Sequence, residues 1–167
     1  RSLASVRSFY QYLVYIGAVE SNPTKGIALK KAEKKLPEIL TQKEIDSLIA
    51  QPDITTLRGC RDKAMLELMY ATGLRVSELI ALNLEDVHLT MGFVRCIGKG
   101  NKERIVPIYP AAVRSIANYL VNVRPVIVLE ETEDKLFTNM NGKNLSRQGF
   151  WKIIKHYADM AGINKDI

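Results

Sequence analysis

The sequence predicts a mainly α-helical protein with a small antiparallel β-hairpin, which places it in the α+β class. Apolar residues recur at helical spacing through most of the 167 residues. The pattern changes to short strand-like runs at 93–97 and 104–108, where the Gly- and Asn-containing segment 98–103 connects them. Apolar residues make up 47% of the chain, enough for a core, and no run of about 18 apolar residues predicts a membrane span.

The first predicted helix covers residues 2–17 and ends at Gly17. Its apolar positions share one face, formed by Leu3, Val6, Tyr10, Leu13 and Val14. One helix cannot bury its own apolar stripe. We therefore expect residues 1–17 to be the last helix of an N-terminal helical domain.

Residues 18–40 predict a basic interdomain linker, because Pro23 and Pro37 interrupt regular structure there. The segment between these prolines has a net charge of +4, out of +6 for the whole chain. Two interpretations stay open. The segment is either a solvated connector or a connector that lies along a phosphate backbone.

A second domain is predicted over residues 41–167, and it opens on a capping box formed by Thr41 and Glu44. Ser146 is the expected N-cap of a late helix, and Pro110 the first residue of an earlier one. A short extended segment is predicted at 135–137. The predicted helices of this domain are 42–50, 57–72, 75–81, 110–123 and 147–160.

The charge and the cysteines limit the kinds of partner. An estimated pI of 9.3 favours a polyanion, either nucleic acid or anionic lipid. Cys60 and Cys96 lack a CxxC or paired-His context, so they predict small buried side chains and no zinc site. The low cysteine count and the absence of a signal-peptide pattern favour a cytoplasmic protein.

Arg75 is the first candidate for chemistry, since it follows the turn at Gly73 and begins a short helix. A guanidinium there lies near free backbone N–H groups and suits bidentate binding of phosphate oxygens. Glu78 falls on the same helical face and would orient or balance Arg75. The alternative is a surface ion pair that contributes less than about 1 kcal/mol.

The predicted hairpin is the second candidate, because Lys99, Lys102 and Arg104 lie at its tip and flank. Glycines at 98 and 100 allow its backbone to approach a duplex closely. The alternative is an edge hairpin whose charges protect it against aggregation.

Residues 71–79 and 97–104 together resemble the tyrosine recombinase (phage integrase) family, and in particular its bacterial Xer group. Residues 41–45 resemble the beginning of that family's catalytic domain, and 145–151 resemble its late DNA-contacting helix. The resemblance covers essentially the whole chain. It implies an incomplete integrase-like catalytic core over 41–167 and the end of a helical core-binding domain over 1–17.

The resemblance also implies a reaction. Such recombinases act as tetramers on double-stranded DNA and cleave one strand with a tyrosine, without a metal or nucleotide cofactor. The attack forms a 3′-phosphotyrosyl link and frees a 5′-hydroxyl. Arg75 matches the arginine that holds the scissile phosphate, and Lys99 matches the hairpin lysine that protonates the leaving oxygen. A lysine with an ordinary pKa of about 10.4 is protonated and able to donate at neutral pH.

The family's His-x-x-Arg box, the following His or Trp and the nucleophilic tyrosine have no match here, and we assign none of the seven tyrosines as nucleophile. We therefore expect the chain to be truncated at both ends and inactive alone. His156 suggests a DNA-backbone contact or a solvated position, and His88 a structural role. Trp151 either packs or stacks.

The predicted late helix supplies the remaining DNA contacts, from Ser146, Arg147 and Gln148 at its start. Its other face is expected to pack into the core. An ordinary amphipathic helix without DNA contacts is the alternative.

The resulting hypothesis is site-specific DNA recombination by the parent protein, serving chromosome-dimer resolution or integration of a mobile element. Its partners would be double-stranded DNA and other recombinase protomers, with no membrane. The alternatives are a non-catalytic DNA-binding module, a truncated decoy, or a basic domain with no DNA role.

Overall fold

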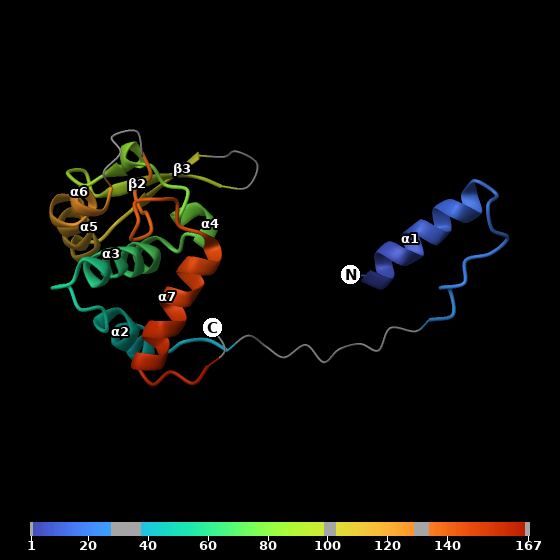
Figure 1. The fold of residues 1–167 in the computed structure, drawn as a ribbon, viewed down its shortest axis with the longest axis horizontal. Helices are drawn as coiled ribbons and strands as arrows, with labels where there is room; N and C mark the ends of the chain where they lie inside the picture. The colour runs from blue at the N-terminus through green and yellow to red at the C-terminus, as the bar shows by residue number, and fades with distance from the viewer. Residues whose placement is uncertain (1, 28–37, 99–102, 129–133, 166–167) are drawn as a thin grey trace. The chain divides into compact units, whose positions relative to one another are not determined.

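The computed structural model describes residues 2–27, 38–98, 103–128 and 134–165. The chain divides into two compact units, residues 1–37 and residues 38–167 (Figure 1). Within the described residues, helices predominate and the strands form one small sheet, which confirms the predicted α+β class.

The first unit contains helix α1 (Ser2–Tyr15), slightly shorter than predicted. The chain after it turns at Gly17, which has a φ of 74°. Arg7 of α1 donates from Nη2 to the carbonyl oxygens of Thr24 and Ile27, at 3.3 and 3.1 Å. Asn22 returns a hydrogen bond to the Arg7 carbonyl at 3.1 Å. Part of the segment predicted as a linker is thus bonded to α1.

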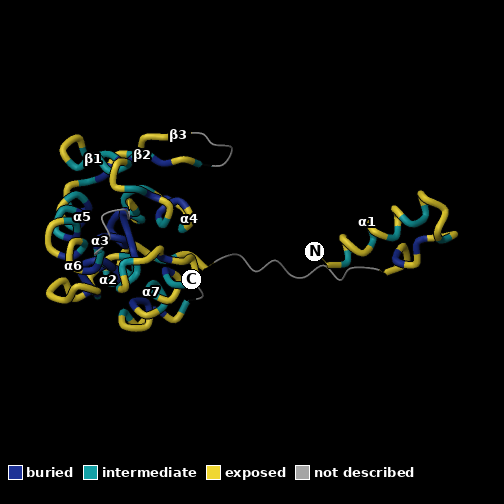
Figure 2. Tube along the Cα trace, turned by 45° about the horizontal axis from the view of Figure 1, so that its top comes forward, coloured by how far each residue is buried: buried dark blue, intermediate teal, exposed yellow. Residues whose placement is uncertain are grey.

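The core of the second unit surrounds helix α3 (Leu57–Thr72), which packs against α5 (Pro110–Asn122). One face of α3 is buried, with Ala64, Met65 and Leu68 all inaccessible to solvent. Figure 2 shows this buried interior beneath an exposed outer surface. Helix α7 (Arg147–Met160) contacts α4 and α2, so it spans the unit between them (Figure 1).

The sheet has three antiparallel strands in the order β1–β2–β3: Val87–His88, Phe93–Ile97 and Glu103–Pro107. Both strands of the predicted hairpin are confirmed, and the second begins one residue earlier than expected. Val94 and Cys96 of β2 are buried. The two-residue strand β1 was not predicted, because so short a run carries no detectable period. His88 of β1 stacks on Phe93 with ring centroids 4.4 Å apart, which is a structural role.

The predicted helix ends are set by local hydrogen bonds. Thr41 and Glu44 form the capping box that begins α2 (Gln42–Ala50). The Ser146 hydroxyl accepts from Gly149 N–H at 3.0 Å and caps α7, while Gly73 ends α3 with a φ of 60°. These boundaries agree with the sequence prediction.

The short elements agree less well. Helix α4 covers only Val76–Leu79, inside the predicted 75–81. The 3₁₀ helix η1 (Leu84–Asp86) and helix α6 (Arg124–Ile127) were not predicted. One helical turn is too short to show a 3.6-residue period.

Candidate functional site

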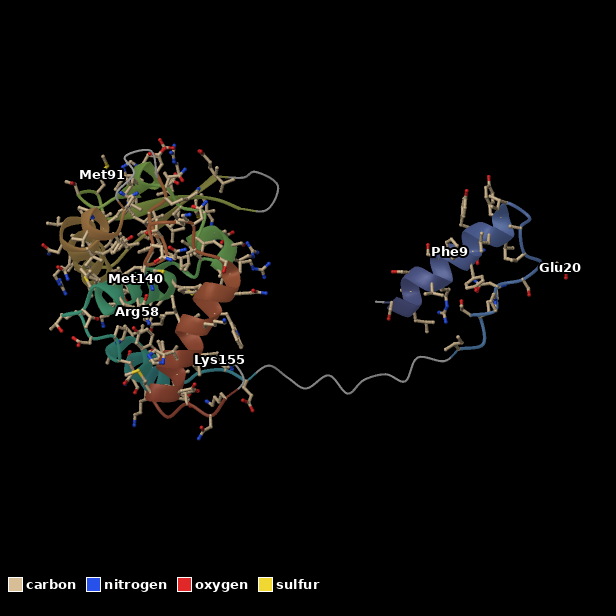
Figure 3. All side chains as sticks on the ribbon, viewed as in Figure 1. Phe9, Glu20, Arg58, Met91, Met140 and Lys155 are labelled. Carbon is tan, nitrogen blue, oxygen red and sulfur yellow. The ribbon has the colours of Figure 1, made fainter. Side chains whose placement is uncertain are left out.

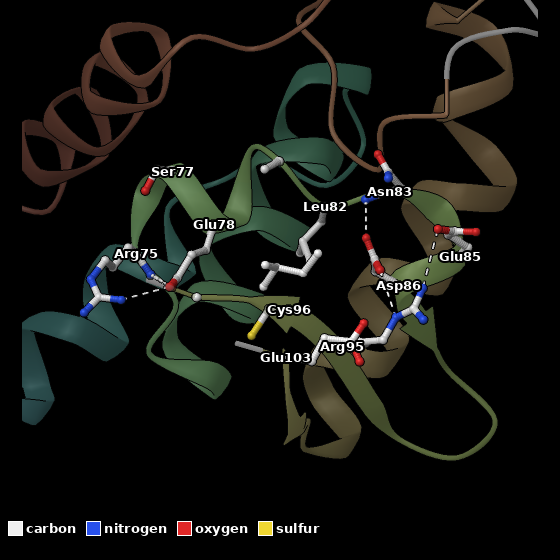
Figure 4. Close-up of a pocket in the computed structure, with 13 residues that line it drawn as sticks. Arg75, Ser77, Glu78, Leu82, Asn83, Glu85, Asp86, Arg95, Cys96 and Glu103 are labelled. Atoms are coloured by element: carbon white, nitrogen blue, oxygen red, sulfur yellow. Dashed lines mark hydrogen bonds and ion pairs between the residues drawn. The ribbon is translucent and has the colours of Figure 1, made fainter. Parts of the chain in front are cut away.

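Arg75 lies where the chain leaves α3 and enters α4. The left-handed conformation of Gly73 ends α3, and Arg75 is the extended N-cap residue of α4, with φ −67° and ψ 151°. Its Nη1 lies 2.9 Å from Oε1 of Glu78, while its side chain keeps 65% of its surface exposed. The predicted pair therefore forms, and the guanidinium remains accessible to a ligand (Figure 4).

Glu78 is the buried centre of this arrangement. Its Oε2 accepts the Arg75 backbone N–H at 2.7 Å and also Nη2 of Arg104 at 2.9 Å. The backbone N–H of Arg75 holds the pKa of Glu78 below its ordinary value; burial opposes this shift, and the two guanidiniums reinforce it. Glu78 is thus a charged hub, by which we mean a carboxylate that orients two arginines. It is not simply the partner of Arg75 in a surface ion pair.

Arg104, on strand β3, is the second arginine that contacts Glu78. It lies opposite Cys96 in the β2–β3 register, and its Nε donates to Sγ of Cys96 at 3.0 Å. The sequence predicted Arg104 as part of a basic hairpin but did not predict its contact with Glu78. The two residues are 26 positions apart, and only the packing of the sheet on α4 brings them together.

An open groove of about 720 Å³ lies beside the hub. Arg75 and Glu78 stand at one end, and Arg95 at the other (Figure 4). Arg95 bonds to Asp86 at 3.2 Å and to Glu85 at 3.5 Å. Arg95 with its two carboxylates carries a formal charge of −1, whereas the cluster of Arg75, Arg104 and Glu78 carries +1.

Two predicted site residues, Lys99 and Lys102, lie outside the described residues. Their assignment stays a prediction. The described ends of the hairpin, at Gly98 and Glu103, both line the groove beside Glu78.

The start of α7 forms a second surface close to Arg75. Arg147 and Gln148 are exposed, and with Trp151 they line a depression of about 510 Å³ that also includes Val76, the residue after Arg75. Ser146 uses its hydroxyl as the helix cap. Trp151 is 53% exposed, and Lys155, labelled on α7 in Figure 3, lies 5.7 Å from its ring centroid. The predicted DNA-contacting residues of α7 thus share one accessible face.

The four tyrosines of the second unit lie away from the groove beside Arg75. Tyr119 and Tyr157 are buried, and their hydroxyls donate to the Leu136 carbonyl and to Asp62, each at 3.0 Å. Tyr109 bonds to Glu67, and burial raises the pKa of its hydroxyl. Tyr70 is half exposed and donates to Gln42. None of these four lines the groove beside Arg75.

Within the described segments, no group of three or more His, Cys, Asp or Glu side chains is placed to hold a metal ion. No helix in those segments is long and apolar enough to cross a membrane. Cys60 and Cys96 are both buried, as predicted, and they form no disulfide with each other.

Comparison with known proteins places this chain in a family. The profile described as the phage integrase family matches residues 38–167. The chain is 47% identical over 167 residues to the tyrosine recombinase XerD of Halalkalibacterium halodurans and 48% identical to that of Staphylococcus epidermidis. These matches cover 100% of this chain but only 56% and 57% of the two relatives, so the chain spans little more than half their length.

Solved structures show the same fold. The XerH recombinase bound to a palindromic difH substrate superposes with a TM-score of 0.71 and 22% identity, over 89% of this chain and 44% of that one. The lambda integrase bound to DNA superposes with a TM-score of 0.73 and 13% identity. The match covers 98% of this chain and 56% of that one. With its fold, its sequence profile and its relatives in agreement, the chain belongs to the phage integrase family of tyrosine recombinases.

Proposed function

We propose that the protein containing this chain carries out site-specific DNA recombination, breaking and rejoining strands through a 3′-phosphotyrosyl intermediate. The observation that carries the proposal is Arg75, held by the buried Glu78 and still 65% exposed. A guanidinium fixed in this way can grip the non-bridging oxygens of a scissile phosphate. Its charge would stabilise the negative charge that develops on those oxygens in the transition state.

The remaining roles follow from the resemblance and from position. Lys99, which the resemblance assigns as the hairpin lysine, would protonate the leaving 5′-oxygen. Arg147 and Gln148, on the exposed start of α7, would contact the duplex, with Ser146 holding the helix end that presents them. Lys102 would add a phosphate contact. The net charge of +6 supports a polyanionic partner.

Assembly and biological role are proposed at a coarser level. One lambda integrase structure of the same fold is a tetramer bound to a Holliday junction. We infer that protomers of this protein also assemble on DNA. We propose chromosome-dimer resolution, more than integration of a mobile element, as the role that the resemblance to the Xer group implies.

The proposal is tested by trapping the covalent intermediate. The protein translated from the complete reading frame is used to enrich its site from random-sequence duplexes, and the enriched site is rebuilt with a nick that prevents religation. We expect a covalent protein–DNA adduct that withstands denaturant. Arg75→Ala should reduce the rate of adduct formation at least about 100-fold, the usual effect of removing a group that stabilises the transition-state charge.

Arg95→Gln is the matched control, because Arg95 lines the same groove but pairs with other carboxylates. It should form the adduct at the normal rate. Salt-dependent duplex binding without any adduct would instead favour a non-catalytic DNA-binding module. Absence of duplex binding would refute both.

A further inference from the structure

We propose that Arg104 is a positioning residue, which ties the base of the β2–β3 hairpin to α4 through Glu78 and does not itself bind a DNA phosphate. The inference rests on the proposed function and deepens it. It replaces the simpler expectation that every basic residue of the hairpin contacts DNA. Arg104 then determines how the hairpin stands relative to Arg75.

The first support is the way the Arg104 guanidinium is used. Its Nε donates to Sγ of Cys96 at 3.0 Å, and its Nη2 donates to Oε2 of Glu78 at 2.9 Å. Nε and Nη2 lie on the same edge of the planar group. That edge is one of those that could grip a phosphate in bidentate fashion, and here protein atoms already occupy it.

The second support is the contrast with Arg75. Arg75 contacts Glu78 through Nη1 and keeps 65% of its side chain exposed, whereas Arg104 keeps 43% exposed and has two anchors. Both arginines face one carboxylate, which leaves a formal charge of +1 on the cluster. Arg104 thus directs its guanidinium at protein atoms, whereas Arg75 keeps most of its side chain accessible to a ligand.

The third support is the limited packing of β3. Most residues of this strand are exposed, and its regular hydrogen bonds go to β2 alone. The Arg104–Glu78 ion pair joins the exposed strand to a buried residue of α4. The Cys96 contact fixes the direction of the Arg104 side chain, since the two residues are cross-strand partners. A change at Arg104 should thus shift the hairpin without removing a DNA contact.

The experiment compares Arg104→Gln with the wild type and with Arg95→Gln, an arginine of the adjoining strand that forms ion pairs away from Glu78. Duplex affinity is measured against salt concentration with this 167-residue chain. Adduct formation at saturating nicked duplex is measured with the protein from the complete reading frame. A phosphate contact contributes about 0.9 to the slope of log affinity against log salt, whereas a positioning residue contributes none.

We expect Arg104→Gln to leave the salt slope unchanged and to slow adduct formation about 10- to 100-fold, the effect of a small misplacement of catalytic groups. Arg104→Lys, which retains the charge and one anchor, should restore part of the rate. The double variant Glu78→Gln/Arg104→Gln should be no slower than Glu78→Gln, because both changes break the same link.

Two results would overturn the inference: a salt slope reduced by about 0.9 in Arg104→Gln, or an adduct rate equal to that of Arg95→Gln. If Arg104→Gln does not fold, the same two criteria are applied to Arg104→Thr, which also removes the charge and suits an exposed strand. If the proposed function itself is wrong, the wild type will form no adduct. That result differs from either of the two that would overturn the inference about Arg104.

Discussion

Glu44 and Glu78 occupy the same position, the third residue of a helix, and each accepts the backbone N–H of its N-cap residue at 2.7 Å. Their surroundings differ. Lys165 reaches Glu44 from the end of the chain, with its Nζ 2.6 Å from Oε2. This lysine, followed by the Thr41 hydrogen bonds, lowers the pKa of Glu44 to about 2. The spacing predicted the capping box, but a partner 121 residues away was not predictable.

Replacing Lys165 should therefore raise the pKa of Glu44. In Lys165→Met, the NMR titration midpoint of the Glu44 carboxyl should move from about 2 toward 4.5, since the largest cause of the shift is gone. Lys165→Arg, which keeps the charge, should leave the midpoint low. The folded pKa lies below the unfolded one, so the stabilisation is complete above pH 4.5 and disappears as pH falls through about 2. An unchanged midpoint in Lys165→Met would contradict this account.

At the scale of whole elements, the two glycines at the ends of α3 have different tasks. A Cβ on Gly59 would lie 2.0 Å from the Asp53 carbonyl oxygen, whereas a Cβ on Gly73 would meet nothing within 4 Å. Gly73 is needed for its positive φ of 60°. Gly59 is needed because the segment before the helix passes directly over it.

The alanine variants should separate these two tasks. Gly73→Ala should lower the free energy of unfolding by about 1–2 kcal/mol, the cost of a left-handed alanine. Gly59→Ala should cost more, because a backbone atom must move. Urea unfolding followed by circular dichroism measures both. Gly73→Asn, which tolerates the left-handed conformation, is the control and should be milder than Gly73→Ala. Equal losses in the two alanine variants would show that the close approach at Gly59 is unimportant.

The long elements were predictable because each carries many periods and a local end signal. Helices α2, α3, α5 and α7 and both hairpin strands lie within a residue or two of their predicted bounds. The elements that escaped prediction, β1, η1 and α6, are four residues or fewer. For the site, the Arg75–Glu78 pair followed from helical spacing. The third member, Arg104, depends on how the sheet packs on α4, and no local pattern encodes that.

At the scale of the molecule, a buried polar network joins distant parts of the second unit. Arg61 and Asp62 of α3 form an ion pair at 2.6 Å, with 4% and 2% of their side chains exposed. Arg61 also donates to the Thr138 carbonyl, and Tyr157 of α7 donates to Asp62. The network thereby connects α3, which leads to Arg75, with α7, which carries Arg147. Its members are too far apart in sequence to have been predicted together.

Removing one partner of the buried Arg61–Asp62 ion pair should strongly lower the free energy of unfolding. Arg61→Met should lower the free energy of unfolding by about 3–5 kcal/mol, because it leaves the Asp62 carboxylate buried without its partner. The double variant Arg61→Met/Asp62→Leu should lose less of the free energy of unfolding, since no unpaired buried charge remains. Glu85→Gln, at the exposed Arg95 pair, should change stability by no more than about 0.5 kcal/mol. Urea titrations of the three variants test this order, and a double variant less stable than Arg61→Met would reverse the interpretation.

The bond between Arg75 and Glu78 also bears on the thermodynamics of DNA binding. A free arginine side chain loses up to about 2 kcal/mol of rotamer entropy when it is immobilised. Arg75 is already restrained by Glu78 before any DNA arrives, while much of its surface stays open. The loss of rotamer entropy at Arg75 therefore occurs when the protein folds and not when DNA binds. Preorganisation of this kind leaves the arginine's contribution to DNA affinity largely enthalpic, which calorimetry of Arg75→Ala against the wild type would register as a change in heat.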